Sequence, residues 1–373
     1  MRVILFFGVT FAAMLNFCSF ANADILIGIG APFTGDYAAY GVQIQKGAEA
    51  AAAEINASGG INGEKILFSV GDDAYDPAQG MAVANKFVSS GVKFVIGHVN
   101  SEVSIYTSDV YARNGILMVS PASTNPTFTD RPKPLWNTFR TCGRDDRQGN
   151  VAAAYIAEKF KDAKIAIVDD KTPYGRGLAN ATAKTLKSKG VKVAFRQSID
   201  YRSEEFSPLV ARVRKTGVTL LYWGGLDKQA GQIMRQLAEN DLKVQFVAGD
   251  GIMTNRLASI AGGAAAGTLN TFAPQPANNP AHKYLVEKFR AAGIEPAEYA
   301  FNAYAAVQSI AAAATAAKST DPKMVAKAMK EKGPFKTVLG NISYDKKGDS
   351  TLPGYVMYKW ARAADGSYSY YQQ

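Results

Sequence analysis

The sequence has 373 residues, of which 47% are hydrophobic and 11% aromatic, and a formal net charge of +10. A chain of this length and apolar content buries a large core, which excludes the disordered and fibrous classes and favours two lobes over one. Its lysines are scattered over predicted helical faces without the aromatic interleaving of a nucleic-acid surface. We therefore expect a solvated basic exterior and no nucleic-acid partner.

The first 23 residues, MRVILFFGVTFAAMLNFCSFANA, form a distinct segment. A positive charge at Arg2 is followed by an uncharged apolar run and by an Ala-Asn-Ala sequence that ends at Ala23. This arrangement is typical of a secretory signal peptide. We predict export and cleavage after Ala23, so that the mature chain begins at Asp24.

Two alternatives to cleavage are less favoured. A membrane anchor would keep an unbroken apolar run followed by basic residues, whereas Thr10 and Asn16 interrupt this run and no basic cluster follows. Lipidation at Cys18 would require a small residue where the bulky Phe17 stands. Cleavage leaves Cys142 as the only cysteine, so no intrachain disulfide is expected.

After the signal, short strands alternate with amphipathic helices, which is typical of parallel α/β architecture. The first series predicts strands at 25–30, 65–70, 92–98 and 116–120 and helices at 40–60, 77–91 and 101–115. The rhythm breaks at 126–149, where one extended run is expected. The second series predicts strands at 163–170, 191–199, 218–225 and 244–250 and helices at 147–160, 174–190, 206–217 and 227–240.

The C-terminal part predicts helices at 281–293, at 298–319 and within 321–332, followed by a hairpin over 354–373 that turns at Asp365-Gly366. Two α/β series predict two doubly wound lobes with parallel sheets. We assign residues 24–142 and 274–353 to the first lobe. Residues 143–273 and 354–373 make up the second.

The glycines of the first strand raise the possibility of a nucleotide-binding loop. Gly28 and Gly30 are followed by Gly35, which does not match the spacing of the dinucleotide motif, and the acidic pair after the second strand comes too late. No phosphate-binding loop of the GxxxxGK[ST] type is present either. We therefore expect no nucleotide cofactor.

Metal and nucleophile chemistry lacks suitable residues, because the mature chain has only two histidines, His98 and His282, and one thiol. We interpret His98 as a hydrogen-bonded structural imidazole and His282 as solvated. Adjacent carboxylates are expected to cap helices or face solvent; they are Asp72-Asp73, Asp145-Asp146 and Asp169-Asp170. The sequence thus predicts no metal, no catalytic residue and no enzymatic activity.

Small polar residues do recur at the carboxyl ends of the predicted strands, where ligands bind in open α/β sheets. In the first series, Ser101 and Thr124 offer hydroxyl and backbone N–H donors suited to a carboxylate. In the second series, Asp250 lies between glycines and can reach an ammonium group. A ligand that carries both charges would bridge the two lobes.

Four segments carry a resemblance to a known family: 54-EINASGGINGEKI-66, 71-GDDAYDPAQGMAVANKFVSSGVKFVIGH-98, 114-NGILMVSPASTNP-126 and 170-DKTPYGRGLA-179. They resemble the periplasmic leucine/isoleucine/valine-binding proteins, the receptors of branched-chain amino-acid ABC transporters. The resemblance runs from Asp24 to about Trp360. It implies the type I binding-protein fold with three hinge crossovers, a periplasmic location, a monomer, and membrane permease subunits as partners.

The resemblance also implies roles for single residues. Ser101 and Thr124 match residues that hold the carboxylate and ammonium of the amino acid, and the Ala122 carbonyl matches an acceptor for the ammonium. Asp250 stands where the family usually has glutamate. The side-chain pocket would be lined by Tyr40, Val99, Asn100, Tyr174 and Tyr299.

Three positions depart from the family pattern. Tyr75 and Asn100 replace a cysteine pair, and Leu226 replaces a tyrosine at the charged end of the ligand. Losing that hydroxyl removes a hydrogen bond worth about 1 kcal/mol. These changes leave open a receptor of the same fold for urea, a short amide or an aromatic acid. A secreted α/β enzyme is the alternative from another class, and the shortage of His and Cys disfavours it.

Overall fold

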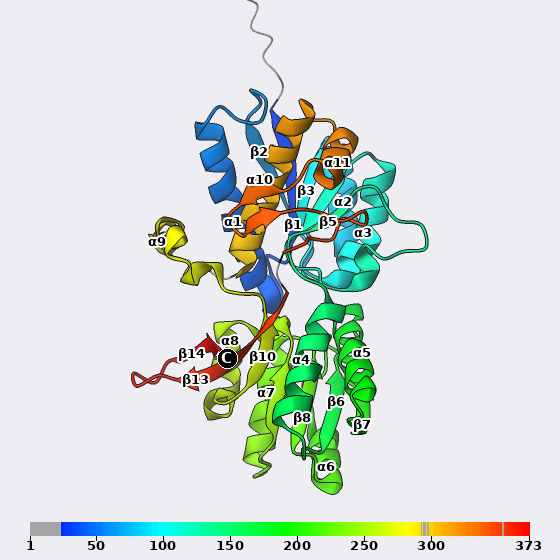
Figure 1. Ribbon diagram of the computed structural model, residues 1–373, viewed down its shortest axis with the longest axis vertical. Helices are drawn as coiled ribbons and strands as arrows, with labels where there is room; N and C mark the ends of the chain where they lie inside the picture. The colour runs from blue at the N-terminus through cyan, green and yellow to red at the C-terminus, as the bar shows by residue number, and fades with distance from the viewer. Residues whose placement is uncertain (1–23, 292, 294–295, 297, 353) are drawn as a thin grey trace, which may run out of the picture.

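The computed structural model describes residues 24–291, 293, 296, 298–352 and 354–373, so the predicted signal and its cleavage point lie outside the described residues. Within these ranges the chain forms two lobes, one above the other along the long axis (Figure 1). None of the helices in these ranges combines the length and the hydropathy that a membrane-spanning helix requires.

The upper lobe is built on a sheet that, among the described residues, has five parallel strands in the order β2-β1-β3-β4-β5. The strands are β1 (Ile25–Ala31), β2 (Ile66–Asp72), β3 (Phe94–Gly97), β4 (Leu117–Ser120) and β5 (Thr138–Arg140). Its helices are α1 (Ala38–Ala57), α2 (Pro77–Ser89), α3 (Ser101–Arg113), α10 (Glu298–Ala317) and α11 (Pro322–Glu331). The 3₁₀ turns η1 (Gly35–Tyr37) and η2 (Pro126–Phe128) and the small hairpin β11 (Phe335–Thr337) and β12 (Gly340–Ile342) complete it.

The lower lobe contains a seven-stranded sheet within the described part, in the order β14-β13-β10-β9-β8-β6-β7. Its strands are β6 (Ile165–Asp169), β7 (Val193–Ser198), β8 (Leu220–Gly224), β9 (Gln245–Ala248), β10 (Leu269–Phe272), β13 (Val356–Arg362) and β14 (Tyr368–Gln372). Its helices are α4 (Asp145–Lys159), α5 (Pro173–Ser188), α6 (Ser207–Thr216), α7 (Asp227–Glu239) and α8 (Asn255–Ala261), with η3 (Asp250–Ile252) and η4 (Gly262–Ala265). After β10 the chain returns toward the upper lobe through η5 (Pro276–Asn278), η6 (Pro280–His282) and α9 (Lys283–Ala291). Helix α9 projects to one side, beside the upper lobe (Figure 1).

The chain passes between the lobes three times: after β5, after β10 and before β13. This confirms the predicted α/β fold with two lobes and three crossovers. The boundaries 24–142 with 274–353 and 143–273 with 354–373 stay a proposal, supported by the strands, since every described strand of the five-stranded and seven-stranded sheets lies in the lobe to which its residues were assigned.

The predicted elements form with ends shifted by a few residues, for local reasons. Three helices were predicted to include Gly59, Gly91 and Gly115 at their C-terminal ends. The observed helices end before these glycines, because each glycine has a positive φ that terminates the helix. At the other end, Asp76 and Thr172 accept hydrogen bonds from backbone N–H groups and so begin α2 and α5.

Two features of the second sheet differ from the prediction. Strand β10 was not predicted, because its sequence LNTF alternates weakly and runs into a proline-containing segment. The sheet is also mixed: β10 pairs antiparallel with β13, and β13 with β14. Strands β13 and β14 form the predicted 354–373 hairpin, and its Gly366 adopts the positive φ that the turn requires.

Candidate functional site between the lobes

A small cavity of about 20 Å³ lies between the lobes at the carboxyl ends of their parallel strands. It is lined by Tyr40, Tyr75, Val99, Ser101, Ala122, Tyr174, Leu226, Asp250, Gly251 and Tyr299. Eight of the ten predicted site residues are in this set, although they come from distant parts of the chain. A cavity of this size holds about one water molecule, so the two walls nearly meet.

The upper wall offers hydrogen-bond donors. Ser101 is the first residue of α3 and is 2% exposed, and its Oγ accepts a hydrogen bond from the Asn125 N–H at 3.3 Å. Ala122 follows β4, where the Ser120 hydroxyl accepts from its N–H at 3.3 Å. A helix N-terminus and neighbouring backbone N–H groups are suited to a carboxylate.

The lower wall offers an acidic group. Asp250 is buried, and the Tyr174 hydroxyl donates to its Oδ1 at 2.8 Å while accepting from the Gly251 N–H at 3.0 Å. Burial raises the pKa of Asp250, and the nearby Gln148 amide and the hydrogen bond from the Tyr174 hydroxyl offset part of this effect. A cation in the cavity would favour the ionised form of Asp250.

The other two predicted site residues, Asn100 and Thr124, are buried beside the cavity but do not line it. Asn100 begins α3: its Oδ1 accepts from the Glu102 N–H at 2.8 Å, and its Nδ2 donates to the Tyr75 carbonyl at 3.1 Å. The Asn100 side chain therefore links the first turn of α3 to the segment that carries Tyr75. The Thr124 hydroxyl has no hydrogen-bond partner among the described residues.

Tyr75 lines the cavity and was not predicted to do so. It has φ of 64°, which is unusual for a bulky residue, and its N–H donates to Asp73 Oδ1 at 2.9 Å. Its ring lies 4.4 Å from that of Tyr37, measured between centroids. Its place just beyond the carboxyl end of the second strand was the signal that could have identified it.

His98 has the structural role that was predicted. It is fully buried, with Nδ1 2.6 Å from Asp73 Oδ2 and Nε2 3.0 Å from the Tyr111 hydroxyl. Its backbone carbonyl accepts from the Ser120 hydroxyl at 2.8 Å. These bonds fix the loop that carries Val99 and the start of α3. The prediction that His282 is solvated was wrong in part, because this residue is half-buried and its Nδ1 lies 2.8 Å from the Pro276 carbonyl.

Asp145 is a second buried acidic residue near Asp250, and the sequence led us to expect that it caps a helix or faces solvent. It is fully buried, and neither carboxylate oxygen has a hydrogen-bond partner among the described residues. Burial and the nearby Asp250 raise the pKa of Asp145 well above its usual value, although the neighbouring Thr124 hydroxyl opposes this. Adjacency in sequence did not distinguish Asp145 from Asp146, because burial depends on tertiary packing.

Direct contacts across the cleft join the lobes. The Tyr40 hydroxyl donates to the Gly251 carbonyl at 3.1 Å, and Asn125 Nδ2 donates to the Pro173 carbonyl at 2.6 Å. Lys228 of α7 forms an ion pair with Asp36 of η1 at 2.8 Å. The lobes are therefore closed on one another.

The geometry suits binding of a small polar molecule, with donors above and a carboxylate below. Across the ranges that the structure describes, no three His, Cys, Asp or Glu side chains are grouped so that they could hold a metal ion. The donors of the upper wall and the buried carboxylate of the lower wall are complementary to a ligand that has an anionic end and a cationic end.

Comparisons with known proteins identify the family to which the chain belongs. A family model described as periplasmic binding protein matches residues 24–366. The chain is 60% identical to Leu/Ile/Val-binding protein homolog 1 of Brucella melitensis biotype 1 over 373 residues, which cover 100% of both chains. It is 42% identical to an amino acid binding protein of Pseudomonas aeruginosa over 352 residues, 94% of this chain and 93% of the relative.

Among solved structures, the chain is similar to the leucine binding protein LivK from Thermotoga maritima. The TM-score is 0.83 at 26% sequence identity, and the match covers 93% of this chain and 97% of that chain. The family model and the relatives extend over nearly the whole length of the chain and confirm the resemblance stated from the sequence. The chain belongs to the periplasmic binding protein family.

Proposed function

We propose that this chain is the substrate-binding component of an amino-acid ABC transporter and that it binds an aliphatic amino-acid zwitterion between its lobes. The observation that carries the proposal is that one cavity is lined by Ser101 and Ala122 of the upper lobe and by Asp250 and Tyr174 of the lower lobe. Donors above suit the ligand carboxylate, and Asp250 suits the ammonium. The names of the relatives support the same class of ligand.

The mechanism is capture without catalysis. The closed cavity has too little room for an amino acid, so the ligand enters when hinge motion separates the walls. It first meets the donors of the upper lobe, and closure then brings Asp250 to the ammonium. Micromolar affinity corresponds to about 8 kcal/mol, within reach of a few charge-assisted hydrogen bonds and a buried side chain.

The remaining parts of the proposal concern the setting. Export with cleavage after Ala23 delivers the protein to the periplasm, where the closed form docks as a monomer on membrane permease subunits. Selectivity among aliphatic side chains should be modest, because one methylene is worth about 1–3 kcal/mol in such a site. We expect a group preference.

Calorimetry against the twenty amino acids tests the proposal, and no heat with any of them would overturn it. The sharper test is Asp250→Ala, which should weaken amino-acid binding at least 100-fold because the buried ammonium loses its counter-charge. The exposed Asp241 supplies the control, since Asp241→Asn is expected to bind as the unaltered protein does. Amino-acid affinity retained by the Asp250 variant would show that the ammonium binds elsewhere.

A receptor for urea or a short amide is the second candidate. The observation that favours it is the narrowing of the cavity by four tyrosines: Tyr40, Tyr75, Tyr174 and Tyr299. Including urea and acetamide in the same calorimetric series separates the candidates. A neutral amide that binds equally well to the protein and to Asp250→Ala would favour the amide receptor.

A further inference from the structure

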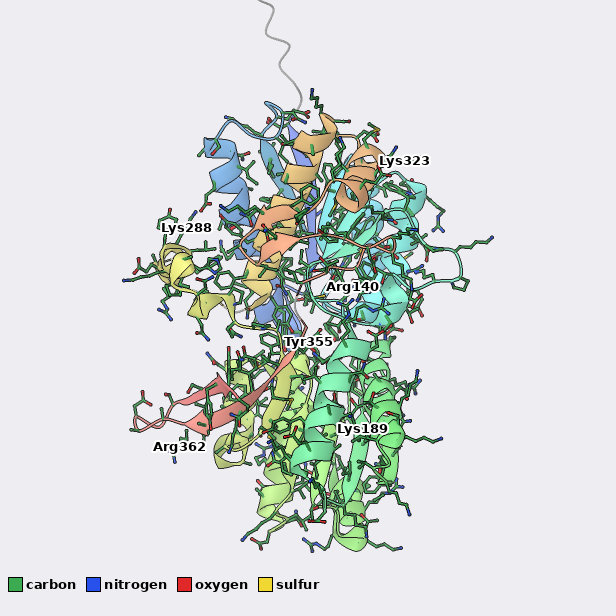
Figure 2. The ribbon with its side chains drawn as sticks, viewed as in Figure 1. Arg140, Lys189, Lys288, Lys323, Tyr355 and Arg362 are labelled. Atoms are coloured by element: carbon green, nitrogen blue, oxygen red, sulfur yellow. The ribbon has the colours of Figure 1, made fainter. Side chains whose placement is uncertain are left out.

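A second cavity, of about 390 Å³, lies at the hinge. All three crossovers line it, with Thr141–Gly143 from the first, Ala273–Gln275 from the second, and Leu352 and Tyr355 from the third. Tyr355 lies where the two lobes meet (Figure 2). The described lining shares no residue with the cleft cavity, so the two are distinct.

We propose that this hinge cavity is a second binding site, for a small carboxylic acid with an apolar body. Its volume is within the range of about 300–1,000 Å³ that is common for sites of small organic ligands. Much of its wall is apolar, formed by Pro274, Val338, Leu352 and the ring of Tyr355. This wall suits an aromatic ring or a branched alkyl group.

The polar groups at this cavity favour an anion. Arg147, on the first turns of α4, is exposed and lines the cavity, and its guanidinium can bind a carboxylate. Gln275 Nε2 is buried and has no hydrogen-bond partner among the described residues. His282 contacts Pro276 through Nδ1, which leaves Nε2 for the ligand or for solvent. Donors from three side chains thus border a cavity whose lining combines the apolar wall with hydroxyl groups, those of Thr141, Thr337 and Ser350.

Because the crossovers change conformation when the lobes move, a molecule that touches all three is sensitive to the state of the hinge. The cavity has its present shape while the Tyr40–Gly251 and Asn125–Pro173 hydrogen bonds hold the lobes closed. An occupant that fits this shape therefore favours closure. By linkage it also raises the affinity of the cleft for its own ligand, and this coupling rests on the proposed amino-acid function.

Calorimetry of the purified mature protein with phenylacetate tests the hinge site, with phenylacetamide as the uncharged matched probe. We expect phenylacetate to bind at least fivefold more tightly than phenylacetamide. Arg147→Gln and Gln275→Leu should each weaken phenylacetate at least fivefold, whereas Arg235→Gln, an exposed arginine on α7, should not. Unchanged binding by both the Arg147 and Gln275 variants would overturn the proposal.

Two further arms separate the hinge site from the cleft. Asp250→Ala should leave phenylacetate binding unchanged, and saturating leucine should strengthen it. Competition between leucine and phenylacetate would place phenylacetate in the cleft and overturn the proposal. If leucine gives no heat but the Arg147 and Gln275 effects hold, the amino-acid function fails for leucine while the hinge site stands.

Discussion

Asp170 shows how a single residue couples site architecture to pH. It follows β6, and its Oδ1 accepts from the Thr172 N–H at 3.0 Å and from the Thr172 hydroxyl at 2.6 Å, which holds the start of α5 and therefore Tyr174. Burial raises the pKa of Asp170 to about 7, and the hydrogen bonds from Thr172 only partly oppose this shift.

Since the folded pKa exceeds the unfolded value, the stabilisation from Asp170 is fully present below about pH 4 and is lost as pH rises through 7. Asp170→Asn removes this loss. The free energy of unfolding of the variant minus that of the unaltered protein should therefore increase from pH 4 to pH 8, by at most about 4 kcal/mol. Urea unfolding at pH 4, 6 and 8 measures it, and a pH-independent difference between the two proteins would contradict the prediction.

Gly30 is a residue whose role lies in packing. A Cβ at this position on β1 would lie 2.5 Å from His98 Cε1, and the imidazole cannot withdraw because Asp73 and Tyr111 hold both nitrogens. Gly30→Ala should lower the free energy of unfolding by about 1–3 kcal/mol. Gly263→Ala is the matched control, since its Cβ would have no atom within 4 Å. Equal urea midpoints for the two variants would show that the core rearranges to accept the added methyl group at Gly30.

At the scale of elements, η1 of the upper lobe meets the starts of α7 and α8 of the lower lobe. Lys228 bridges Asp36 and Glu204, at 2.8 and 3.0 Å. Arg256 pairs with Asp227 at 2.5 Å, and its guanidinium carbon lies 5.1 Å from the centroid of the Tyr37 ring. The Lys228–Asp36 and Arg256–Tyr37 contacts cross between the lobes and therefore contribute to closure directly, whereas the pairs with Glu204 and Asp227 lie within the lower lobe and hold the two cations in place.

Lys228→Gln should therefore weaken ligand binding, but only modestly. Partly exposed ion pairs are worth about 0–1 kcal/mol, so we expect at most about a fivefold loss of affinity, which should disappear at high salt. Lys215→Gln, at an exposed lysine of α6, supplies the control for the removal of one positive charge. A loss of affinity that is the same at low and high salt would indicate a role for Lys228 other than charge pairing.

At the scale of the whole molecule, buried charges tie the first and third crossovers together. Arg140 is fully buried, with Nε 2.7 Å from Asp349 Oδ1, and Arg144 lies 2.5 Å from Asp349 Oδ2. Arg140 lies in the part of the upper lobe that faces the lower lobe (Figure 2). By the proposed boundaries Arg140 and Asp349 belong to the upper lobe and Arg144 to the lower, so Asp349 joins the two lobes at the hinge.

Binding to a closed two-lobed protein should stabilise it by mass action. A preferred amino acid at 100 times its Kd should raise the free energy of unfolding by about 2.7 kcal/mol. It should also lower the radius of gyration if the free protein in solution is partly open. Chemical unfolding and small-angle scattering, each with and without ligand, measure the two effects. An unchanged unfolding curve at saturating ligand would contradict specific binding to the folded state.

Much of this architecture was predictable because it rests on local rules. The strand–helix alternation, the Asp365-Gly366 hairpin and the glycine-terminated helices follow from periodicity and from backbone preferences. That Ser101 and Asp250 line the cavity between the lobes was predictable because parallel strands in one sheet end at one edge. Strand β10 was missed because its short sequence lacks a clear period.

By itself, the sequence determined the two-lobed α/β fold, the lack of a nucleotide loop, and the group of residues from which a zwitterion site could be built, since periodicity, turn residues and strand-end position are local properties. Only the tertiary structure decided that Tyr75 enters the cavity, that Asn100 supports the backbone and that Asp145 is buried beside Asp250. It alone joined three crossovers around a hinge cavity. Burial and proximity between residues far apart in the chain are set by packing, and no local pattern encodes them.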